Sequence, residues 1–363
     1  AAVMSAYNRV NGEYCGHSAP LLRRILKEEW GFEGLVMSDF VFGVRDAKAA
    51  ALGGLDIEMP AQWHYHGRLK KLVEQGEVPL AVVDEAVLRI LRTKLRFAHV
   101  GEAQRYGPQA VCCPEHRALA RRAAVESMVL LQNNPVADGK PLLPLTLARF
   151  TRLAVIGRLA DTPNTGDRGS SRVKAPEVVT PLQGLREAWT AGEIVYHNGK
   201  SARAAAEVAA RCDAVVIVAG YDYRDEGEKV ETGGDRKRLA LRPEDESLIL
   251  AVAAANPNTL VVLESGSAVL CEAWREKVAA IVAAWYPGME GGRALADLLL
   301  GRANFSGKLP CTFPASEHHL PFFDSAAQEI EYGYFHGYRL LEHLGQPAAF
   351  AFGFGLSYTT FRA

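Results

Sequence analysis

The stretch Gly34-Leu35-Val36-Met37-Ser38-Asp39 decides how the first part of this 363-residue sequence folds. Its apolar residues form an unbroken run, and polar residues come only at its carboxyl end. Such a run is typical of a strand that is buried on both faces of a parallel sheet. Further runs at residues 3–7 and 54–60 predict strands before and after it, with a helix expected in each interval. This alternation of strands and helices predicts a parallel α/β sheet.

Helical patterns and a polar loop follow the third expected strand. Apolar residues at helical spacing predict two helices over residues 66–97 and a further helix over 116–132. Residues 133–144 are rich in Asn, Pro and Gly, which is typical of a loop, and we expect the main domain boundary there.

The alternation of strands and helices restarts after this loop. Four β-rich runs, at residues 153–157, 214–220, 259–263 and 278–282, are separated by helical segments. They predict a second domain built as a layered α/β sandwich. From Leu320 on, the sequence is richer in aromatic residues and Gly, and residues 357–361 predict one strand without a partner.

Composition excludes several classes of protein. The chain is 48% hydrophobic and carries 41 basic against 42 acidic residues, a net charge of −1, which predicts a globular fold without a basic surface for nucleic acid. No stretch approaches the roughly 18 apolar residues of a membrane span, so we expect neither nucleic-acid nor membrane partners. The first residues have neither the basic nor the apolar region of a signal peptide, and we expect the sequence to begin inside a fold.

The cysteines do not indicate a disulfide framework or a metal site. Six cysteines are few for this length, and none forms a Cys-x-x-Cys pair. The vicinal pair Cys112-Cys113 lies near His116, but it lacks the spacing and the second ligand pair of a zinc site. We therefore expect no metal.

Asp39 lies where the expected strand meets a loop, a position that suits either a helix cap or a catalytic carboxylate. The segments around it favour the second role, because in order and spacing they resemble glycoside hydrolase family 3, whose largest group is the β-glucosidases. The matching segments are VMSAYN at 3–8, EWGFEGLVMSD at 29–39, ALGGLDIEMP at 51–60, GSSRV at 169–173, GGDR at 233–236, AWYPGMEGG at 284–292, SGKLP at 306–310 and FGFGLSYT at 352–359.

The resemblance implies a domain organisation. Residues 1–110 would be the C-terminal part of a (β/α)8 TIM-like barrel, 111–150 a helical linker, and 151–320 an (α/β)6 sandwich. Residues 321–363 would lead to a fibronectin type III-like β-sandwich. A whole barrel needs about 250 residues, so we expect this sequence to be an interior fragment with little activity by itself.

The resemblance also implies site residues. Asp39 matches the catalytic nucleophile of a Ser-Asp-Trp motif, which here reads Ser38-Asp39-Phe40 with an altered aromatic wall. Tyr7 matches a tyrosine near the nucleophile, and its alternative role is packing at a strand end. Met59 is expected near the sugar pocket, and Arg172 matches a segment that faces the site, although a salt bridge is an equal alternative.

A retaining glycosidase also needs an acid/base carboxylate about 5–5.5 Å from the nucleophile. The resemblance places it in the acidic loop at residues 220–231. A Gly-Glu-Gly form of the motif selects Glu226, whereas counting back from Asp235 selects Glu231. Glu226 is the first expectation, followed by Glu231 and Glu228, and the alternative is a solvated acidic loop.

The resulting prediction is a retaining exo-β-glycosidase acting on terminal β-D-glucosyl residues of small substrates, without a cofactor. A β-xylosidase is the alternative within the family, since Phe40, Met59 and Trp63 could reshape the pocket. A non-catalytic fragment or sugar-binding remnant is the alternative from another class. The sequence leaves a homodimer open, and leaves the compartment open between cytoplasm and periplasm.

Overall fold

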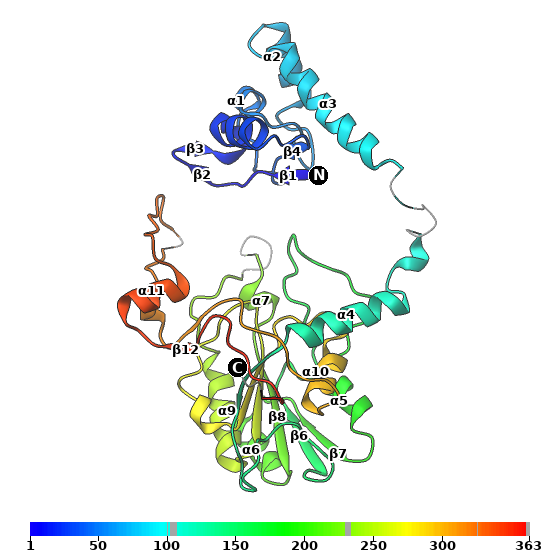
Figure 1. The fold of residues 1–363 in the computed structure, drawn as a ribbon, viewed down its shortest axis with the longest axis vertical. Coiled ribbons are helices and arrows are strands. Elements are labelled where there is room, and N and C mark those ends of the chain that lie inside the picture. Colours follow the sequence, from blue (N-terminus) through cyan, green and yellow to red (C-terminus); the bar gives the residue numbers. More distant parts are fainter. Residues whose placement is uncertain (100, 102–106, 229–233, 325, 361–363) are drawn as a thin grey trace. The chain divides into compact units, whose positions relative to one another are not determined.

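The computed structural model describes residues 1–99, 101, 107–228, 234–324 and 326–360. The chain forms two compact units, Ala1–Pro108 and Gln109–Ala363, both drawn in Figure 1.

The first unit contains the expected parallel strands, although they are short. Strand β1 pairs in parallel with β4 through Val3 and Val36, and Met37 makes a single parallel bridge to Ile57, where a full third strand was expected. The elements of this unit are β1 (Ala2–Met4), β2 (Arg9–Val10), β3 (Glu13–Tyr14), η1 (Cys15–His17), η2 (Pro20–Glu29), β4 (Leu35–Met37), α1 (Ala47–Gly53), α2 (His66–Glu74) and α3 (Leu80–Phe97).

A small core and one well-capped helix hold these parallel segments. Val36 of β4 is fully buried and packs with residues of η2 and α1. Asp46 caps the N-terminus of α1, and its carboxylate accepts the backbone N–H of Ala49 at 2.7 Å. Gly54 caps the C-terminus, and its φ of +104° suits glycine because it has no Cβ. These two caps define the ends of α1, the helix that connects β4 to the segment containing Ile57.

The second unit is built on a six-stranded sheet in the order β5-β10-β9-β8-β6-β7. All neighbours are parallel except β5 and β10, which are antiparallel. The elements are η4 (Pro108–Ala110, at the boundary of the units), α4 (Pro114–Ser127), β5 (Val129–Asn133), β6 (Arg152–Ile156), α5 (Pro181–Ala188), β7 (Glu193–His197), α6 (Ala202–Ala209), β8 (Ala214–Gly220), α7 (Tyr223–Glu226), α9 (Pro243–Ala255), β9 (Thr259–Glu264), η5 (Arg275–Lys277), β10 (Ala280–Ala283), α10 (Gly291–Leu299), β11 (Phe313–Pro314), η6 (Glu317–His319), α11 (Gly337–Leu344) and β12 (Ala348–Phe350).

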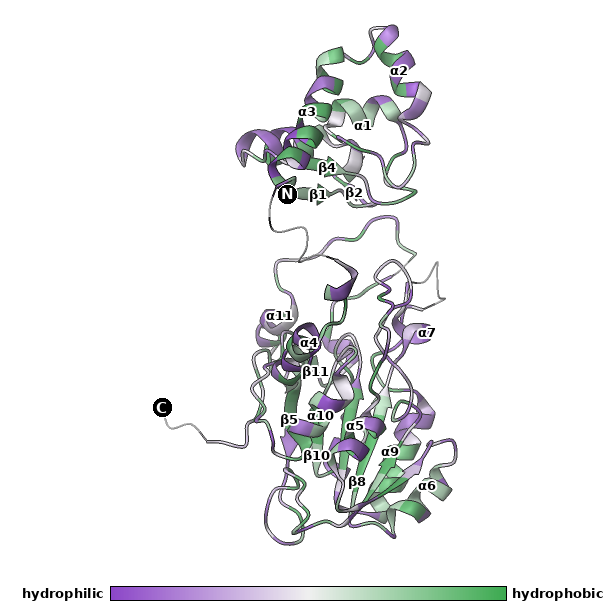
Figure 2. Ribbon diagram, turned by 90° about the vertical axis from the view of Figure 1, so that its right-hand side faces the viewer, coloured by the Kyte–Doolittle hydropathy of each residue, from purple (hydrophilic) through white to green (hydrophobic). Residues whose placement is uncertain are grey.

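Helices cover both faces of this sheet. In β6, Leu153 and Val155 contribute to a core with α4, α5 and α10, whereas Ala154 and Ile156 contribute to a second core with α6 and α9. The alternation follows from the two-residue period of a strand. Because both faces are covered, strands such as β8 and β10 are apolar throughout, as Figure 2 shows.

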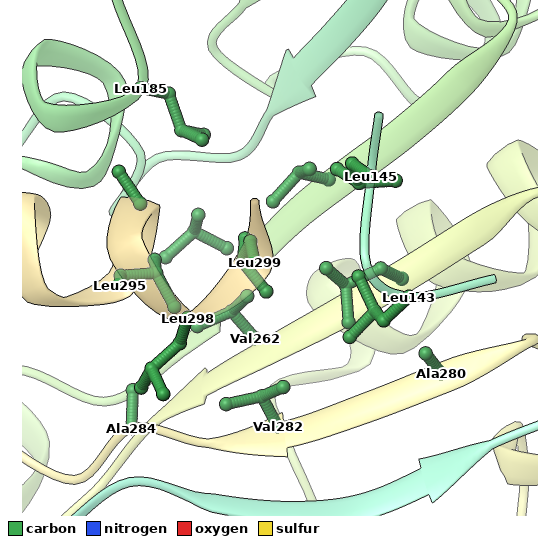
Figure 3. Close-up of a cluster of buried hydrophobic side chains, with 14 of the residues drawn as sticks. Leu143, Leu145, Leu185, Val262, Ala280, Val282, Ala284, Leu295, Leu298 and Leu299 are labelled. Carbon is green, nitrogen blue, oxygen red and sulfur yellow. The ribbon is translucent and has the colours of Figure 1, made fainter. Parts of the chain in front are cut away.

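Helix α10 provides the densest part of the first core. Its residues Leu295, Leu298 and Leu299 lie against Val262 of β9 and Val282 of β10, as Figure 3 shows. All five side chains are at most 2% exposed. Such close packing fixes the helix on the sheet.

The structure corrects several expectations about boundaries. Residues 111–150 are no linker, because β5 is a strand of the main sheet and α4 packs on α10, so both belong to the second unit. The boundary between the units lies at Pro108, not at 133–144. The helix expected over 116–132 ends at Ser127, because the apolar residues that follow it pair with β10.

The expectation of a C-terminal strand is also wrong for the described residues. Residues 357–360 form no strand, and only Leu356 makes an antiparallel bridge, to Leu130. Residue 361 lies outside the described part of the chain. Over the residues that the structure describes, no helix combines the length and apolar character needed to cross a membrane.

Candidate active site

The carboxyl ends of three parallel segments bring candidate site residues together in the first unit. Tyr7 follows β1, Asp39 follows β4, and Met59 follows the bridge residue Ile57. Because parallel neighbours end at the same edge of a sheet, residues distant in sequence meet there.

Hydrogen bonds join these three segments directly. The Tyr7 hydroxyl donates to the backbone oxygen of Phe40 at 2.6 Å, and the backbone N–H of Val41 donates to the oxygen of Met59 at 3.1 Å. The Ser38 hydroxyl, fully buried, accepts the N–H of Met59 at 2.9 Å. The structure therefore brings Tyr7, Phe40 and Met59 together around Asp39.

The Asp39 carboxylate is half-buried and held on one side. Its Oδ1 accepts the backbone N–H of Phe40 at 2.7 Å. Among the described residues, no hydrogen bond or ion pair engages Oδ2. A carboxylate with one oxygen fixed and the other available is suited to attack an electrophilic carbon.

The turn that carries Asp39 is strained. Val41 has a φ of +67°, an uncommon conformation for a β-branched residue. Two residues later, a Cβ at Gly43 would overlap the backbone oxygen of Asp39. Backbone strain of this kind costs about 1–3 kcal/mol and clusters at functional sites, which supports a functional reading of this turn.

In the second unit, Glu226 is firmly held by three groups. Its Oε1 lies 2.9 Å from Nε of Arg236, and these side chains are only 12% and 9% exposed, respectively. Its Oε2 accepts the backbone N–H of Gly266 at 2.6 Å and the hydroxyl of Tyr286. Both oxygens of the carboxylate are therefore engaged within the second unit.

The segment before Glu226 is also fixed. Asp222 caps the short helix α7, accepting the N–H of Arg224 at 2.9 Å, and receives a hydrogen bond from Arg158 at 2.6 Å. Asp225 pairs with Arg242 at 2.7 Å. All three acidic side chains at residues 222–226 are therefore engaged within the second unit rather than simply solvated.

The other predicted residues of the second unit have different surroundings. Glu228 is exposed, and its carboxylate accepts the backbone N–H of Ser170 at 3.2 Å and the hydroxyl of the same serine. Arg172 is exposed and near Gly169, whose oxygen accepts its backbone N–H at 3.1 Å. Glu231 lies outside the described residues.

Two contributors were missed although their motifs were noted in the sequence. Arg236 and Tyr286 lie in the segments GGDR and AWYPGMEGG, but nothing in their local pattern indicates that both contact Glu226. Burial, and then the hydrogen bond to Glu226, raise the pKa of the Tyr286 hydroxyl well above its usual range. Tyr286 is therefore a stable donor to the carboxylate.

A buried carboxyl group lies at the end of the neighbouring strand β9. Burial raises the pKa of Glu264 to about 8, although Asn164 donates a hydrogen bond to it at 2.8 Å. Within the described ranges, no three His, Cys, Asp or Glu side chains are grouped as metal ligands would be.

Comparison with known protein families identifies both units. Residues 1–93 match the Glycosyl hydrolase family 3 N terminal domain, and residues 128–358 match the Glycosyl hydrolase family 3 C-terminal domain. The chain belongs to glycoside hydrolase family 3.

Relatives in this family include enzymes with more than one named activity. The chain is 33% identical to beta-glucosidase BoGH3A of Bacteroides ovatus, covering 99% of the chain and 53% of the relative. It is 34% identical to thermostable beta-glucosidase B of Acetivibrio thermocellus, covering 99% and 48%. It is also 31% identical to an exo-α-(1→6)-L-arabinopyranosidase of Bifidobacterium breve, covering 99% and 48%. The chain thus spans about half the length of the curated relatives it matches.

Solved structures agree. A beta-D-glucoside glucohydrolase from Trichoderma reesei superposes with a TM-score of 0.88 at 26% identity, covering 100% of the chain and 54% of that structure. This similarity confirms the α/β fold of family 3 β-glucosidases.

Proposed function

We propose that the protein containing these residues is a retaining exo-β-glycosidase that releases terminal β-D-glucosyl residues. The observation that carries the proposal is the position of Asp39 after the carboxyl end of β4, beside Tyr7, Phe40 and Met59, in a chain of family 3. One oxygen of its carboxylate is bound by a backbone N–H. The two beta-glucosidases at 33% and 34% identity support a glucoside as substrate.

The proposed chemistry is a double displacement. The Asp39 carboxylate attacks the anomeric carbon while an acid protonates the departing oxygen, and the glycosidic bond breaks. The same group, now a base, takes a proton from water, which attacks the anomeric carbon and releases the sugar from Asp39. The residues present require no cofactor for these steps.

The contacts of Glu226 bear on the choice of the acid/base. The sequence puts Glu226 first, but both oxygens of its carboxylate are already bound within the second unit, Oε1 by Arg236 and Oε2 by Gly266 and Tyr286. We therefore propose that Glu226 holds the loop in place and that Glu231 or Glu228 supplies the proton. Azide rescue separates the three: the Glu→Gln variant of the true acid/base recovers turnover with azide, and rescue of Glu226→Gln alone would return the role to Glu226.

The nucleophile is tested with Asp39→Asn, which keeps an acceptor for the Phe40 N–H. Turnover of an aryl β-glucoside by the natural gene product should fall by at least about 10³-fold, because a covalent step is lost. Asp84→Asn, an exposed control on α3, should retain full turnover. A 2-deoxy-2-fluoro glucoside should label the peptide that contains Asp39. Unchanged turnover of Asp39→Asn, or a product of inverted configuration, would overturn the proposal.

A second activity remains a candidate because one relative is named an arabinopyranosidase. Aryl β-xyloside and α-L-arabinopyranoside should be compared with the glucoside, and a higher kcat/KM on either would replace glucose as the preferred sugar. Phe40, 43% exposed beside Asp39, is the aromatic side chain expected to influence this preference.

The fold of a longer protein is also proposed. The parallel segments β1, β4 and Ile57 with their helices are suited to part of a (β/α)8 barrel, since each strand is followed by a helix or loop that returns to the next. A fibronectin-like domain beyond residue 363 stays a prediction from the resemblance.

A further inference from the structure

The order of strands in the second unit creates a crevice between β6 and β8. From β6 the chain passes through α5, on one face of the sheet, to β7 at the edge. It then passes through α6, on the other face, to β8, which lies on the opposite side of β6. From β8 the chain continues to α9, which packs on the same face as α6. Loops that leave adjacent strands toward opposite faces separate at the carboxyl edge, and ligands of open α/β sheets bind in such places.

A cavity of about 230 Å³ occupies this position. One wall comes from the segment after β6, and the other comes from Asp222, Tyr223 and Arg224 after β8. The volume is below the roughly 300–1,000 Å³ of sites for drug-sized ligands. It therefore suits a ligand no larger than about one sugar ring.

The lining of the cavity is cationic. Arg158, Arg168 and Arg224 contribute three positive charges, whereas Asp222 contributes one negative charge. Asp222 is already bound to Arg158, at 2.6 Å. The described residues offer no carboxylate to Arg168 or Arg224 within ion-pair distance. Two guanidinium groups are thus left with unused donors at the cavity.

Tyr223 orients these two arginines. The guanidinium of Arg168 lies 3.9 Å from the centre of the Tyr223 ring, and that of Arg224 lies 5.3 Å from it. Stacking on an aromatic ring limits the rotation of a guanidinium and leaves N–H donors at its edge. Arg224 is also held by a hydrogen bond from its Nε to the Tyr223 hydroxyl at 3.3 Å, which leaves its terminal N–H groups as donors. Planar donors held in this way match the oxygens of a carboxylate or phosphate.

We propose that this cavity binds a small oxyanion, the carboxylate or phosphate of a molecule about the size of one sugar ring. The described residues that line the cavity all belong to the segments after β6 and β8 of the second unit. The proposal goes beyond the proposed glycosidase activity and does not depend on it, because none of the catalytic candidates among the described residues lines the cavity.

Titration calorimetry of the 363-residue chain tests the proposal with inorganic phosphate, glucuronate and glucose 6-phosphate as probes. Phosphate contains no sugar ring and so reports on the anion site alone. Arg168→Gln and Arg224→Gln should each weaken binding by about tenfold, since each removes charge-assisted hydrogen bonds. Arg203→Gln, an equal loss of charge at an exposed position on α6, should leave binding unchanged.

The three probes distinguish the source of the anion. Tighter binding of glucuronate than of phosphate would indicate a sugar acid, and the reverse order, with glucose 6-phosphate tightest, would indicate a sugar phosphate. Absence of binding by all three, or equal binding by the parent chain, Arg168→Gln and Arg224→Gln, would overturn the proposal. Circular dichroism of Arg168→Gln and Arg224→Gln checks that both variants retain the fold.

Discussion

Replacing Lys27 with methionine is expected to destabilise the first unit strongly. Lys27 Nζ lies 2.7 Å from Oδ1 of Asp56, and the two side chains are only 4% and 2% exposed. Oδ2 of Asp56 accepts the backbone N–H of Val36, at the middle of β4, at 2.7 Å. The ion pair is therefore joined by a hydrogen bond to the strand that precedes Asp39.

The size of the effect follows from burial. Removing one partner of a buried ion pair costs about 3–5 kcal/mol, because the other charge is left without compensation. Methionine is close to lysine in length and fills most of the space, so the loss reports on charge rather than on a cavity. Since whole domains are stable by about 5–15 kcal/mol, the variant should lose a large fraction of the stability of this unit.

The loss of stability in Lys27→Met should be smaller at low pH. Burial raises the pKa of Asp56 in the folded chain, and removing Lys27 raises it further. Between the unfolded and the raised folded pKa, the folded state holds a proton that the unfolded state has released, so stability falls as pH rises. The difference between Lys27→Met and the parent should thus be smaller at pH 5 than at pH 8.

Hydrogen exchange of the β4 amides, followed by mass spectrometry, reports on this unit separately from the second. The double variant Lys27→Met, Asp56→Asn is the matched control, because asparagine keeps an acceptor for Val36 without a charge. It should recover at least half of the lost protection. A loss below about 1 kcal/mol in Lys27→Met, or a double variant no more stable than Lys27→Met, would refute the reasoning.

Three further outcomes are expected. Tyr286→Phe removes a donor to Glu226 and should lower the unfolding free energy of the second unit by about 1.5–2 kcal/mol in urea titrations; an unchanged midpoint would show that the contact contributes nothing. Val41→Gly relieves a positive φ and should raise the stability of the first unit by about 1 kcal/mol, whereas a loss would show that the valine side chain matters more than its backbone. Because burial raises the pKa of Glu264 to about 8, the stability of the second unit should fall as pH rises from about 4.5 to 8. Glu264→Gln, which keeps an acceptor for Asn164, should make that fall smaller, and parallel curves of stability against pH for the two chains would contradict this.

Strands that are buried on both faces were predictable, and others were not. The runs that became β6, β8, β9 and β10 are apolar apart from residues at the ends of β6 and β9, which is the direct consequence of helices on both sides of the sheet. Strand β7 is only half-buried at the sheet edge and was not predicted. Strand β5 was expected as helix, because its apolar run continues the pattern of α4 and only pairing with β10 makes it a strand.

The sequence by itself determined the family, the strand that carries Asp39 and the place of that residue at its carboxyl end. These depend on local order: an apolar run, a polar end and a capped helix are all encoded within a few tens of residues. Only the tertiary structure decided that Glu226 is bound by Arg236 and Tyr286, and that three arginines line a cavity between β6 and β8. These partners are 10 to 66 residues apart in the chain and meet because the crossovers of a parallel sheet bring the ends of its strands to one edge, which no local pattern specifies.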